Sequence, residues 1–386
     1  MKTPPRATLA SRIYEPESGA AAYRLSALVR ALDDDGFATT VLTTRPVEPV
    51  PSTPSVRRWP VIRDSAGAVR GYVQFASFDI PLFFRLLFLA RPDVVIAEPP
   101  PTTGVVCRVI CGLRRIPYVY FAADVTSRAA AGAGVNPLIV AVLRRVEGWV
   151  LRGAAAVLAV SPGVRDEVRE FGVDPERITV VGTGIDTRVF TSQGEAAVSA
   201  DPYLVYAGTM SEVHGAAVFI EAFARIANEF PTARLRMFGA GVEVPMLREL
   251  AATLGADRVE FPGLVSGEET ARWIRGAHAG LASVRPGRNY DFAFATKAFA
   301  TVGCGTPVIY AGVGPARELV ADNDLGWAVD WDAEVVAEAM RASLRTAPTT
   351  ERRRALSEWV DEHHSLRGVG ARAAQAVRGV LPTAGV

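Results

Sequence analysis

Residues 291–320 read DFAFATKAFATVGCGTPVIYAGVGPARELV and contain the most informative pattern of the chain. The pattern predicts a helix that ends at the turn CGTP (304–307), a short buried strand, a loop with Gly312 and Gly314, and a second helix. Glycines let backbone N–H groups approach an anion closely, and Pro315 in the first turn of the second helix directs that helix's positive end toward the same loop. The segment therefore predicts a strand–loop–helix unit that holds an anionic group.

Two other glycine-bearing turns follow predicted strands in the second half of the chain. Gly208 lies in YAGTM, and Gly239 and Gly241 lie in FGAG. Each turn taken alone is typical of a chain reversal that needs a positive φ angle. Because these turns and the loop at 312–314 all follow carboxyl ends of strands in one half of the chain, we expect them to form one diphosphate-binding site.

Lys297 is the first candidate to neutralise this diphosphate. It lies on the helix before the glycine-rich loop among small and apolar neighbours, and the alternative interpretation is a solvated surface lysine. Arg285 and Arg288, in VRPGRNYDF directly after a strand, are the next candidates, with ordinary loop positions as the alternative. His214, beside Gly215 at the start of a helix, is a further side chain that we expect to face the ligand.

In the first half of the chain, Asp124 ends the strand PYVYFAAD. Its carboxylate is placed to accept a hydrogen bond from a substrate hydroxyl, or alternatively to cap the next turn. The four histidines have no metal-ligand spacing, and Cys107 and Cys111 stand one helical turn apart in an apolar segment. The sequence therefore predicts neither a metal site nor a disulfide framework.

Helix-period and strand-like segments alternate along the whole chain. This alternation is typical of parallel sheets with helices on both faces, and a small, polar stretch without periodicity, TSQGEAAVSADP, separates two such series. We therefore expect an α/β protein with two doubly wound Rossmann-like lobes facing a central cleft. The expected divisions are a first lobe at 1–190, a linker at 191–202, a second lobe at 203–350, and C-terminal helices at 351–386 that brace the first lobe.

The charges of the chain are nearly balanced. Lysine and arginine number 42 against 41 acidic residues, for a formal net charge of +1, which predicts no nucleic-acid partner. The stretch MKTPPRATLASRIYEPESG lacks an apolar run of signal-peptide length, and no later segment has the roughly 20 uninterrupted apolar residues that span a bilayer. We therefore expect a cytoplasmic location.

The segment from Phe78 to Leu89 is unusually apolar around Arg85, and Arg91 follows it. One interpretation is a core helix that leads into the buried strand DVVIA. The other is a helix in the membrane interface, because the segment is too short to span a bilayer and is edged by arginines. The second interpretation predicts a peripheral contact with the inner face of the membrane.

Three stretches resemble the retaining nucleotide-sugar glycosyltransferases of the GT-B fold, a family 4-like group with many bacterial surface-polysaccharide and natural-product enzymes. PESGAAAYRLSALVRALDDDGFATTVLTT is similar to that family's first glycine loop, with Gly19 where the backbone approaches the donor diphosphate. AVLAVSPGVRDEVREFGVDPERITVVGTGIDTRVF resembles the end of its first lobe, with Thr183 where the family usually has Asn. CGTPVIYAGVGPARELV resembles its donor loop. The resemblance implies that residues 1–190 bind the acceptor and residues 203–350 bind the nucleotide sugar.

The chain departs from this family at positions that hold the donor. Where the family has an Arg and a Lys on the diphosphate, this sequence has Thr209 and His214. The family's paired glutamates, of which the second ordinarily holds the ribose hydroxyls, fall on Phe292 and Ala300. The family's usual contacts with the diphosphate and the ribose are therefore altered here.

Other residues are candidates to replace these contacts. Asp291 is one position out of register with the first glutamate, and Glu318 stands on the helix after the glycine loop. A related branch also lacks the Arg and the Lys and carries lysine at the position of Lys297, which implies Lys297 as the principal cation. The resulting catalytic candidates are Lys297, Asp124 and His214. The donor-binding candidates are Gly19, Gly208, Thr209, Gly239, Gly241, Lys297, Gly312, Gly314, Glu318, Arg285 and Arg288.

The resemblance implies a retaining glycosyltransferase that moves a sugar from a nucleotide sugar, UDP-linked, to the hydroxyl or amine of a small-molecule or lipid-linked acceptor, without a metal or other cofactor. Two alternatives stay open, because a fold does not determine a reaction. One is a sugar-nucleotide epimerase or a non-glycosidic coupling enzyme, which interconverts or couples sugar nucleotides on the same fold. The other is an inactive pseudo-glycosyltransferase that acts as a binding partner and turns over no donor.

Overall fold

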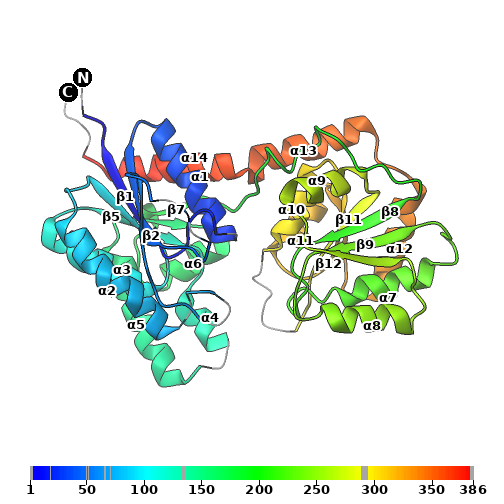
Figure 1. Cartoon of the computed structure of the whole chain (residues 1–386), viewed down its shortest axis with the longest axis horizontal. Coiled ribbons are helices and arrows are strands. Elements are labelled where there is room, and N and C mark those ends of the chain that lie inside the picture. The colour runs from blue at the N-terminus through cyan, green and yellow to red at the C-terminus, as the bar shows by residue number, and fades with distance from the viewer. Residues whose placement is uncertain are drawn as a thin grey trace. The chain divides into compact units, whose positions relative to one another are not determined.

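The computed structural model describes residues 3–17, 19–48, 50, 52–64, 67–69, 71–132, 135–287 and 294–382. The chain divides into two compact units, Met1–Thr183 with Leu366–Val386, and Gly184–Ser365. Each unit is a doubly wound α/β fold around a parallel sheet (Figure 1). The expected fold class, an α/β protein with two doubly wound Rossmann-like lobes, is therefore confirmed.

The first unit contains a seven-stranded sheet in the order β3-β2-β1-β4-β5-β6-β7, counted over its described residues. Short, wholly apolar strands such as VVIA and AVLA are typical of parallel sheets that helices cover on both faces. The strand order reverses between β1 and β4, and ligands bind at such switch points. The strands are β1 (Arg6–Ala10), β2 (Ala38–Thr44), β3 (Val56–Trp59), β4 (Val94–Ala97), β5 (Tyr118–Ala122), β6 (Ala156–Ala159) and β7 (Ile178–Val180).

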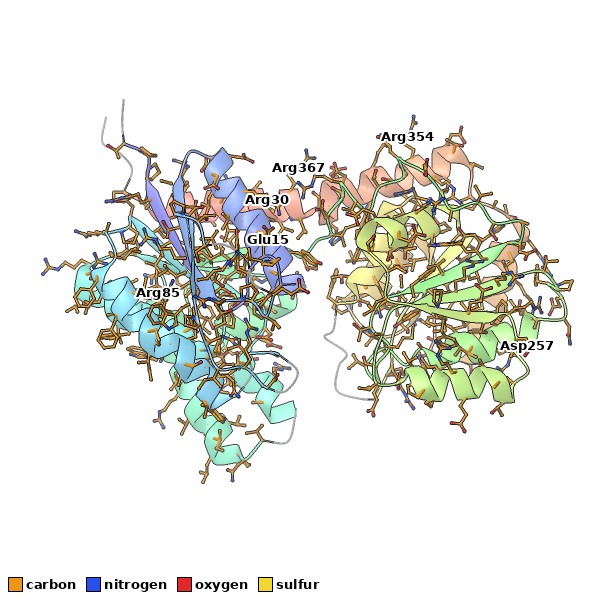
Figure 2. All side chains as sticks on the ribbon, viewed as in Figure 1. Glu15, Arg30, Arg85, Asp257, Arg354 and Arg367 are labelled. Atoms are coloured by element: carbon orange, nitrogen blue, oxygen red, sulfur yellow. The ribbon has the colours of Figure 1, made fainter. Side chains whose placement is uncertain are left out.

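Helices α1 (Ala20–Asp34) and α14 (Leu366–Gly379) pack on each other and share one core with the first sheet. Helices α2 (Tyr72–Phe88), α3 (Pro101–Arg114) and α5 (Pro137–Gly153) share the other core. Near the end of α1, Arg30 forms an ion pair with Glu15 at 2.5 Å, and both residues are labelled in Figure 2. The remaining helices of this unit are α4 (Thr126–Gly132), α6 (Pro162–Arg169) and the 3-10 helix η1 (Pro175–Arg177).

The apolar segment from Phe78 to Leu89 lies on α2. Its Phe78 is buried in the core, whereas Phe84 and Phe88 are exposed. Only one face of α2 therefore packs in the core, as the first interpretation predicts. No helix among the described residues is both long and apolar enough to cross a membrane.

The second unit contains a sheet in the order β10-β9-β8-β11-β12-β13, which reverses between β8 and β11. The strands are β8 (Tyr203–Ala207), β9 (Arg234–Phe238), β10 (Val259–Gly263), β11 (Ala279–Val284), β12 (Val308–Gly312) and β13 (Gly326–Val329). The helices are α7 (Ala217–Ile226), α8 (Val244–Thr253), α9 (Gly267–Gly276), α10 (Thr296–Gly303), α11 (Pro315–Asp322), α12 (Ala333–Arg345) and α13 (Thr350–His364).

The boundary between the two units does not lie at residues 191–202, where the small, polar composition predicts a linker. These residues belong to the second unit, because their backbone groups find partners there. The N–H of Ser192 donates to Ser357 Oγ at 3.1 Å, and the N–H of Ala197 donates to the carbonyl of Arg272 at 2.9 Å. The chain passes between the units at Thr183 and Gly184 instead.

The described residues of the C-terminal stretch, 351–382, contain two helices, as expected, but these helices belong to different units. Ser365 has extended backbone angles, φ −78° and ψ 139°, and ends α13. Helix α13 packs on α10 in the second unit, and α14 packs on α1 in the first. Only α14 therefore supports the first unit in the way expected of the whole stretch.

Candidate active site

The glycine-bearing loops of the second unit lie at the carboxyl ends of β8, β9 and β12, as their positions after strands predict. The loops after β8 and β9 are tied together, since the N–H of Gly208 donates to the carbonyl of Phe238 at 3.0 Å and the N–H of Met210 donates to that of Ala240 at 2.9 Å. These loops line one edge of the sheet beside the switch point between β8 and β11.

Three of the predicted glycines are required by contacts between neighbouring loops. Gly239, Gly241 and Gly312 have φ angles of 129°, 158° and 107°. A Cβ at these positions would lie 2.0, 1.9 and 2.0 Å from the carbonyl oxygens of Gly208, Met210 and Val284, in that order. The structure thus accounts for these glycines by close backbone packing. Whether their N–H groups also bind an anion stays a prediction.

Lys297, near the start of α10, reaches the loop after β8. Its Nζ donates to Tyr206 Oη at 2.7 Å and to the carbonyl of Thr209 at 3.3 Å. Although the residue is only half-buried, apolar surroundings of its ammonium group lower the pKa to about 7. Lys2 is the only other lysine of the chain. Since lysine, unlike arginine, shifts its pKa readily when buried, this position carries a charge that a ligand can control.

Tyr206 is a residue that the sequence pattern did not single out. It is buried in β8, its hydroxyl donates to the carbonyl of Thr209 at 2.8 Å, and it accepts the bond from Lys297. Burial raises the pKa of Tyr206 above its usual range, so the phenol stays neutral. Thr209, where the family places a cation, contributes a carbonyl oxygen that helps hold Lys297 in place. The signal in the sequence is weak, since Tyr206 reads as an ordinary strand residue.

His214 lies in the segment between β8 and α7. Its Nδ1 is 3.1 Å from the carbonyl oxygen of Ser283, and Ser283 Oγ donates back to the carbonyl of His214 at 2.6 Å. Because a carbonyl can only accept, Nδ1 carries the proton in the neutral ring and Nε2 keeps its lone pair. Burial, assisted by the charge of Lys297, lowers the pKa of His214 to about 4. His214 is therefore a neutral hydrogen-bond acceptor at physiological pH.

Arg285 follows β11 at the same edge of the sheet. Its guanidinium lies 4.8 Å from the ring centre of Trp331, and its backbone N–H donates to the carbonyl of Val213 at 2.8 Å. Trp331 Nε1 in turn donates to the carbonyl of Gly215 at 3.1 Å. Trp331 follows β13 and contacts loop residues at this edge of the sheet, and the sequence pattern did not single it out.

The candidates Arg288 and Asp291, and Phe292 at the position of the first glutamate, lie outside the described residues. The loop after β12 is described, and its Gly314 precedes α11 with a φ angle of 105° and Pro315 in the first turn. Glu318 is exposed in that turn, where its carboxylate can accept hydrogen bonds from hydroxyls.

Arg317 on α11 supports the glycine loop, although no sequence pattern singled it out. Its guanidinium donates to the carbonyls of Gly312 at 2.8 Å and Val329 at 2.6 Å, and it pairs with Asp330 at 2.8 Å. The loop is therefore fixed by a side chain from its own helix.

In the first unit, the switch point between β1 and β4 holds a buried carboxylate. Glu98 is 5% exposed and accepts a hydrogen bond from Ser11 Oγ at 3.1 Å. Burial raises the pKa of Glu98 to about 7, against the opposing effect of Arg12 and Arg24. Arg12 is itself held by the carbonyls of Val69 at 2.7 Å and Pro99 at 3.1 Å. The rule that selected Asp124, a carboxylate directly after a buried strand, would also have found Glu98.

Asp124 and Gly19 complete the predicted residues of this unit. Asp124 is exposed just after β5. Loss of water around its carboxyl group nevertheless raises the pKa of that group, and the charge of Arg24 opposes the shift. Gly19 precedes α1 with a φ angle of 143°, and a Cβ added there would meet open space, so its conformation, not crowding, favours glycine. The described residues contain no group of three or more His, Cys, Asp or Glu side chains that could hold a metal ion.

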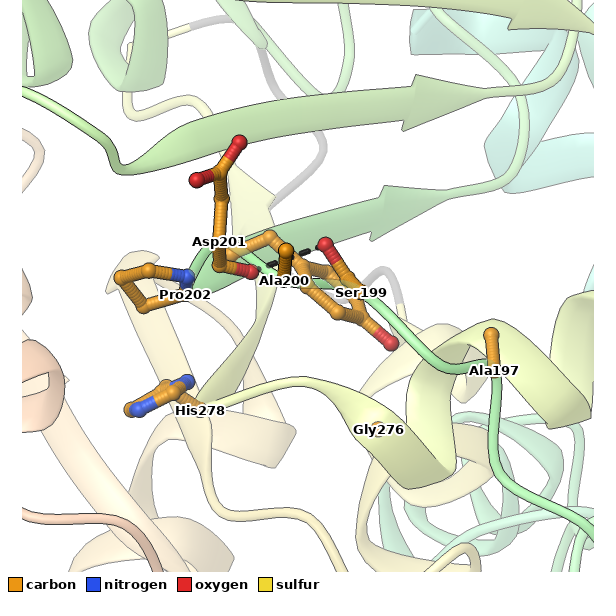
Figure 3. A pocket seen from close by; sticks show the side chains of 8 residues that line it. Ala197, Ser199, Ala200, Asp201, Pro202, Gly276 and His278 are labelled. Carbon is orange, nitrogen blue, oxygen red and sulfur yellow. Dashed lines mark hydrogen bonds between the residues drawn. The ribbon is translucent and has the colours of Figure 1, made fainter.

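A pocket of about 340 Å³ lies at the opposite ends of the strands from these loops, and Figure 3 shows the side chains that line it. It is lined by residues that lead into β8, by Gly276 at the end of α9 and by His278 just before β11, at the amino ends of these strands. Of its polar side chains, Asp201 pairs with Arg234 at 2.8 Å and Ser199 Oγ donates to the carbonyl of Asp201 at 2.9 Å. This pocket contains none of the predicted site residues.

Comparison with known proteins identifies the family to which the chain belongs. Residues 19–184 match the model described as glycosyl transferase 4-like domain, and residues 201–346 match the one described as glycosyl transferases group 1. A D-inositol 3-phosphate glycosyltransferase of Frankia alni is 30% identical over 198 residues, which are 47% of this chain and 47% of that protein. The chain thus spans about half the length of the curated relatives that it matches.

Solved structures show the same fold over nearly the whole chain. The Anabaena protein HepE in complex with UDP has a TM-score of 0.70 at 16% identity, covering 97% of this chain and all of that one. A glycosyltransferase from Rickettsia africae has a TM-score of 0.71 at 13% identity, covering 99% of this chain and 100% of that one. The chain therefore belongs to the family 4-like glycosyltransferases of the GT-B fold, with a glycosyl transferase 4-like domain followed by a group 1 domain.

Proposed function

We propose that this protein transfers a sugar from a UDP-linked donor to an acceptor hydroxyl or amine with retention at the anomeric carbon. We place the reaction in the synthesis of a cell-surface polysaccharide or a natural product, at the cytoplasmic side of the membrane. One observation carries the proposal: Lys297, beside Tyr206 and Thr209, stands at the glycine-loop edge of the second unit. The UDP bound to HepE and the glycosyltransferase names of the relatives support the donor class.

In the proposed reaction, the bond between the anomeric carbon and the β-phosphate oxygen breaks, and the acceptor oxygen or nitrogen bonds to the anomeric carbon on the same face. The acceptor's proton passes to the leaving diphosphate, so no separate protein base is needed. Charge therefore develops on the diphosphate, where a positioned cation stabilises the transition state more than the ground state.

Each residue has a distinct role in this scheme. The ammonium of Lys297 neutralises the leaving diphosphate, and Arg285 adds a second positive charge at the same edge. Neutral His214 accepts a hydrogen bond from a sugar hydroxyl at Nε2, because its Nδ1 is committed to Ser283. Asp124 in the first unit orients the acceptor hydroxyl.

The test is to incubate the protein with a panel of nucleotide sugars and to measure nucleotide release, which needs no known acceptor. We expect slow release from a UDP-sugar and a loss of about 10²- to 10³-fold in Lys297→Ala. Near wild-type turnover in Lys297→Ala, with turnover abolished in Arg285→Ala, would transfer the role to the arginine. Once an acceptor is found, the anomeric coupling constant of the product by NMR tests retention.

The same assay separates the alternative functions. An epimerase interconverts a sugar nucleotide without an acceptor, so a new sugar nucleotide would appear and no free nucleotide. A pseudo-glycosyltransferase would bind UDP in calorimetry and release nothing from any donor. Either result would overturn the proposed transfer reaction while leaving the family unchanged.

A further inference from the structure

Helices α2, α3 and α5 lie side by side on one face of the first sheet (Figure 1). Their inner sides form one hydrophobic core, to which α2 contributes Phe78, Leu82 and Leu86. Their outer sides carry exposed apolar residues, although α5 also packs against α4. This outer surface of α2, α3 and α5 is called the three-helix surface below.

On α2, the exposed residues Val73, Ile80, Phe84 and Phe88 recur at helical spacing and form one stripe opposite the buried face. Phe84 is 53% exposed and Phe88 is 81% exposed. Single exposed apolar residues are ordinary, but a continuous stripe of large ones costs solubility and marks an interaction surface.

The neighbouring helices continue this surface. On α3, Val109 and Leu113 are exposed. On α5, Leu138, Val142 and Trp149 fall on one stripe, with Leu138 78% exposed. Arg108 of α3 lies 4.1 Å from the ring centre of Trp149, which joins the two helices at their outer sides. The stripe of one helix is therefore part of a wider apolar surface.

The acidic side chains of the three helices are buried, whereas several of their arginines are exposed. Their two acidic residues, Asp79 and Glu147, are buried, where Asp79 accepts from Thr103 Oγ1 at 2.7 Å and Glu147 accepts from the N–H groups of Thr126 at 2.8 Å and Ser127 at 3.0 Å. The acids thus serve internal hydrogen bonds and contribute no exposed negative charge.

The arginines of these helices are either exposed or half-buried. Arg144, Arg145 and Arg152 on α5 are exposed, and Arg145 lies in the same stripe as Trp149. Arg85 on α2, labelled in Figure 2, is half-buried. A nearby acid, Glu170, contacts Arg144 at 3.4 Å. The three-helix surface therefore combines large apolar side chains with a net positive charge. The arginines of the three helices are Arg85, Arg108, Arg114, Arg144, Arg145 and Arg152.

We propose that the three-helix surface binds the surface of an anionic lipid bilayer. Phe84, Phe88 and Leu138 would enter the interface between headgroups and acyl chains, and Arg145 would face the negative headgroups. This occupant fits the charge, whereas a second copy of the chain would set arginine against arginine across a two-fold interface. Membrane binding does not depend on the proposed transfer reaction. If both hold, a membrane-bound enzyme favours a lipid-linked acceptor.

The experiment is flotation of the full chain with vesicles of phosphatidylcholine alone and of phosphatidylcholine with about one third phosphatidylglycerol. We expect binding to the anionic vesicles that weakens as salt rises. Phe84→Ser with Phe88→Ser should lower the partition coefficient by at least tenfold, since each loses an apolar side chain from the interface. Arg145→Glu should lower it by about 30-fold, since each unit of charge near such a surface is worth about fivefold.

The matched controls are Val242→Ser and Leu264→Ser in the second unit, whose side chains are 83% and 78% exposed. These variants should float like the wild type. All variants change exposed positions, so melting temperatures should stay unchanged and loss of binding would not reflect unfolding. The proposal would be overturned if the protein does not float with anionic vesicles, or if it floats equally well with neutral vesicles. It would also be overturned if the control variants lose as much binding as the variants of the three-helix surface. A concentration-dependent dimer that Phe84→Ser with Phe88→Ser abolishes would assign the surface to a second copy instead.

Discussion

Lys297 should take up a proton when the protein binds a nucleoside diphosphate. In the free protein its pKa is lowered to about 7, because burial penalises the ammonium more than the amine. A diphosphate beside Nζ would favour the ammonium and return the pKa toward the ordinary value of about 10.5. At pH 8, only about a tenth of the free protein carries the charge, so binding should take up about 0.9 proton.

This linkage fixes the pH dependence of binding. Between pH 7.5 and 9 the diphosphate itself is fully ionised, since its last pKa is near 6. If only the charged lysine binds, affinity follows the protonated fraction of the free protein, and Kd should rise about 25-fold across that interval. An ordinary lysine, with its pKa near 10.5, would change Kd by less than about 10% over the same range.

Two measurements test this reasoning. Calorimetry of UDP binding at pH 8 in buffers of different ionisation enthalpy gives the number of protons taken up. NMR of protein labelled with ¹³C-lysine gives the pKa directly, because the sequence contains only Lys2 and Lys297. The signal of Lys2 is the internal control, and Lys297→Arg assigns the other signal. Lys297→Arg should bind UDP without proton uptake, since a guanidinium stays charged.

The prediction fails if Lys297 titrates above pH 10 in the free protein, or if UDP binding takes up no proton at pH 8. Either result would mean that the ammonium group is well solvated in solution. A proton uptake that persists in Lys297→Arg would place the titrating group elsewhere in the protein.

Three further predictions concern other residues. His214→Gln should change the height but not the shape of the pH–rate profile between pH 5.5 and 9, because the pKa of His214 is lowered to about 4; a lost limb near pH 6.5 would contradict this. Glu98 has a pKa raised to about 7, so the stability it contributes at low pH is lost as pH rises through 7. Chemical denaturation should therefore show Glu98→Gln gaining up to about 3 kcal/mol over wild type between pH 5 and 8. Gly239→Ala should lower the melting temperature sharply, since its Cβ would lie 2.0 Å from a carbonyl oxygen, whereas Gly255→Ala, with open space, should show only the smaller backbone strain.

Local sequence patterns are enough to predict which helices and strands form and which polar groups follow them. Apolar periodicity identified the alternating helices and strands, because a strand buried on both faces and an amphipathic helix have different local patterns. The same local logic placed Gly208, Gly239 and Gly312 after strands and selected Lys297, a basic residue in an apolar helix. These conclusions need only neighbours within about one turn or strand.

Local patterns do not show which of these groups meet in the folded protein, because that depends on strand order. Lys297 and Tyr206 are 91 residues apart, and the position of β11 beside β8 brings their elements to the same side of the unit. Burial then sets the pKa values of Lys297, His214 and Glu98, and no local pattern contains the burial of a side chain by distant segments. The passage between the units at Gly184 and Ser365 was hidden for the same reason: the polar stretch that resembles a linker finds its backbone partners only after the chain has folded.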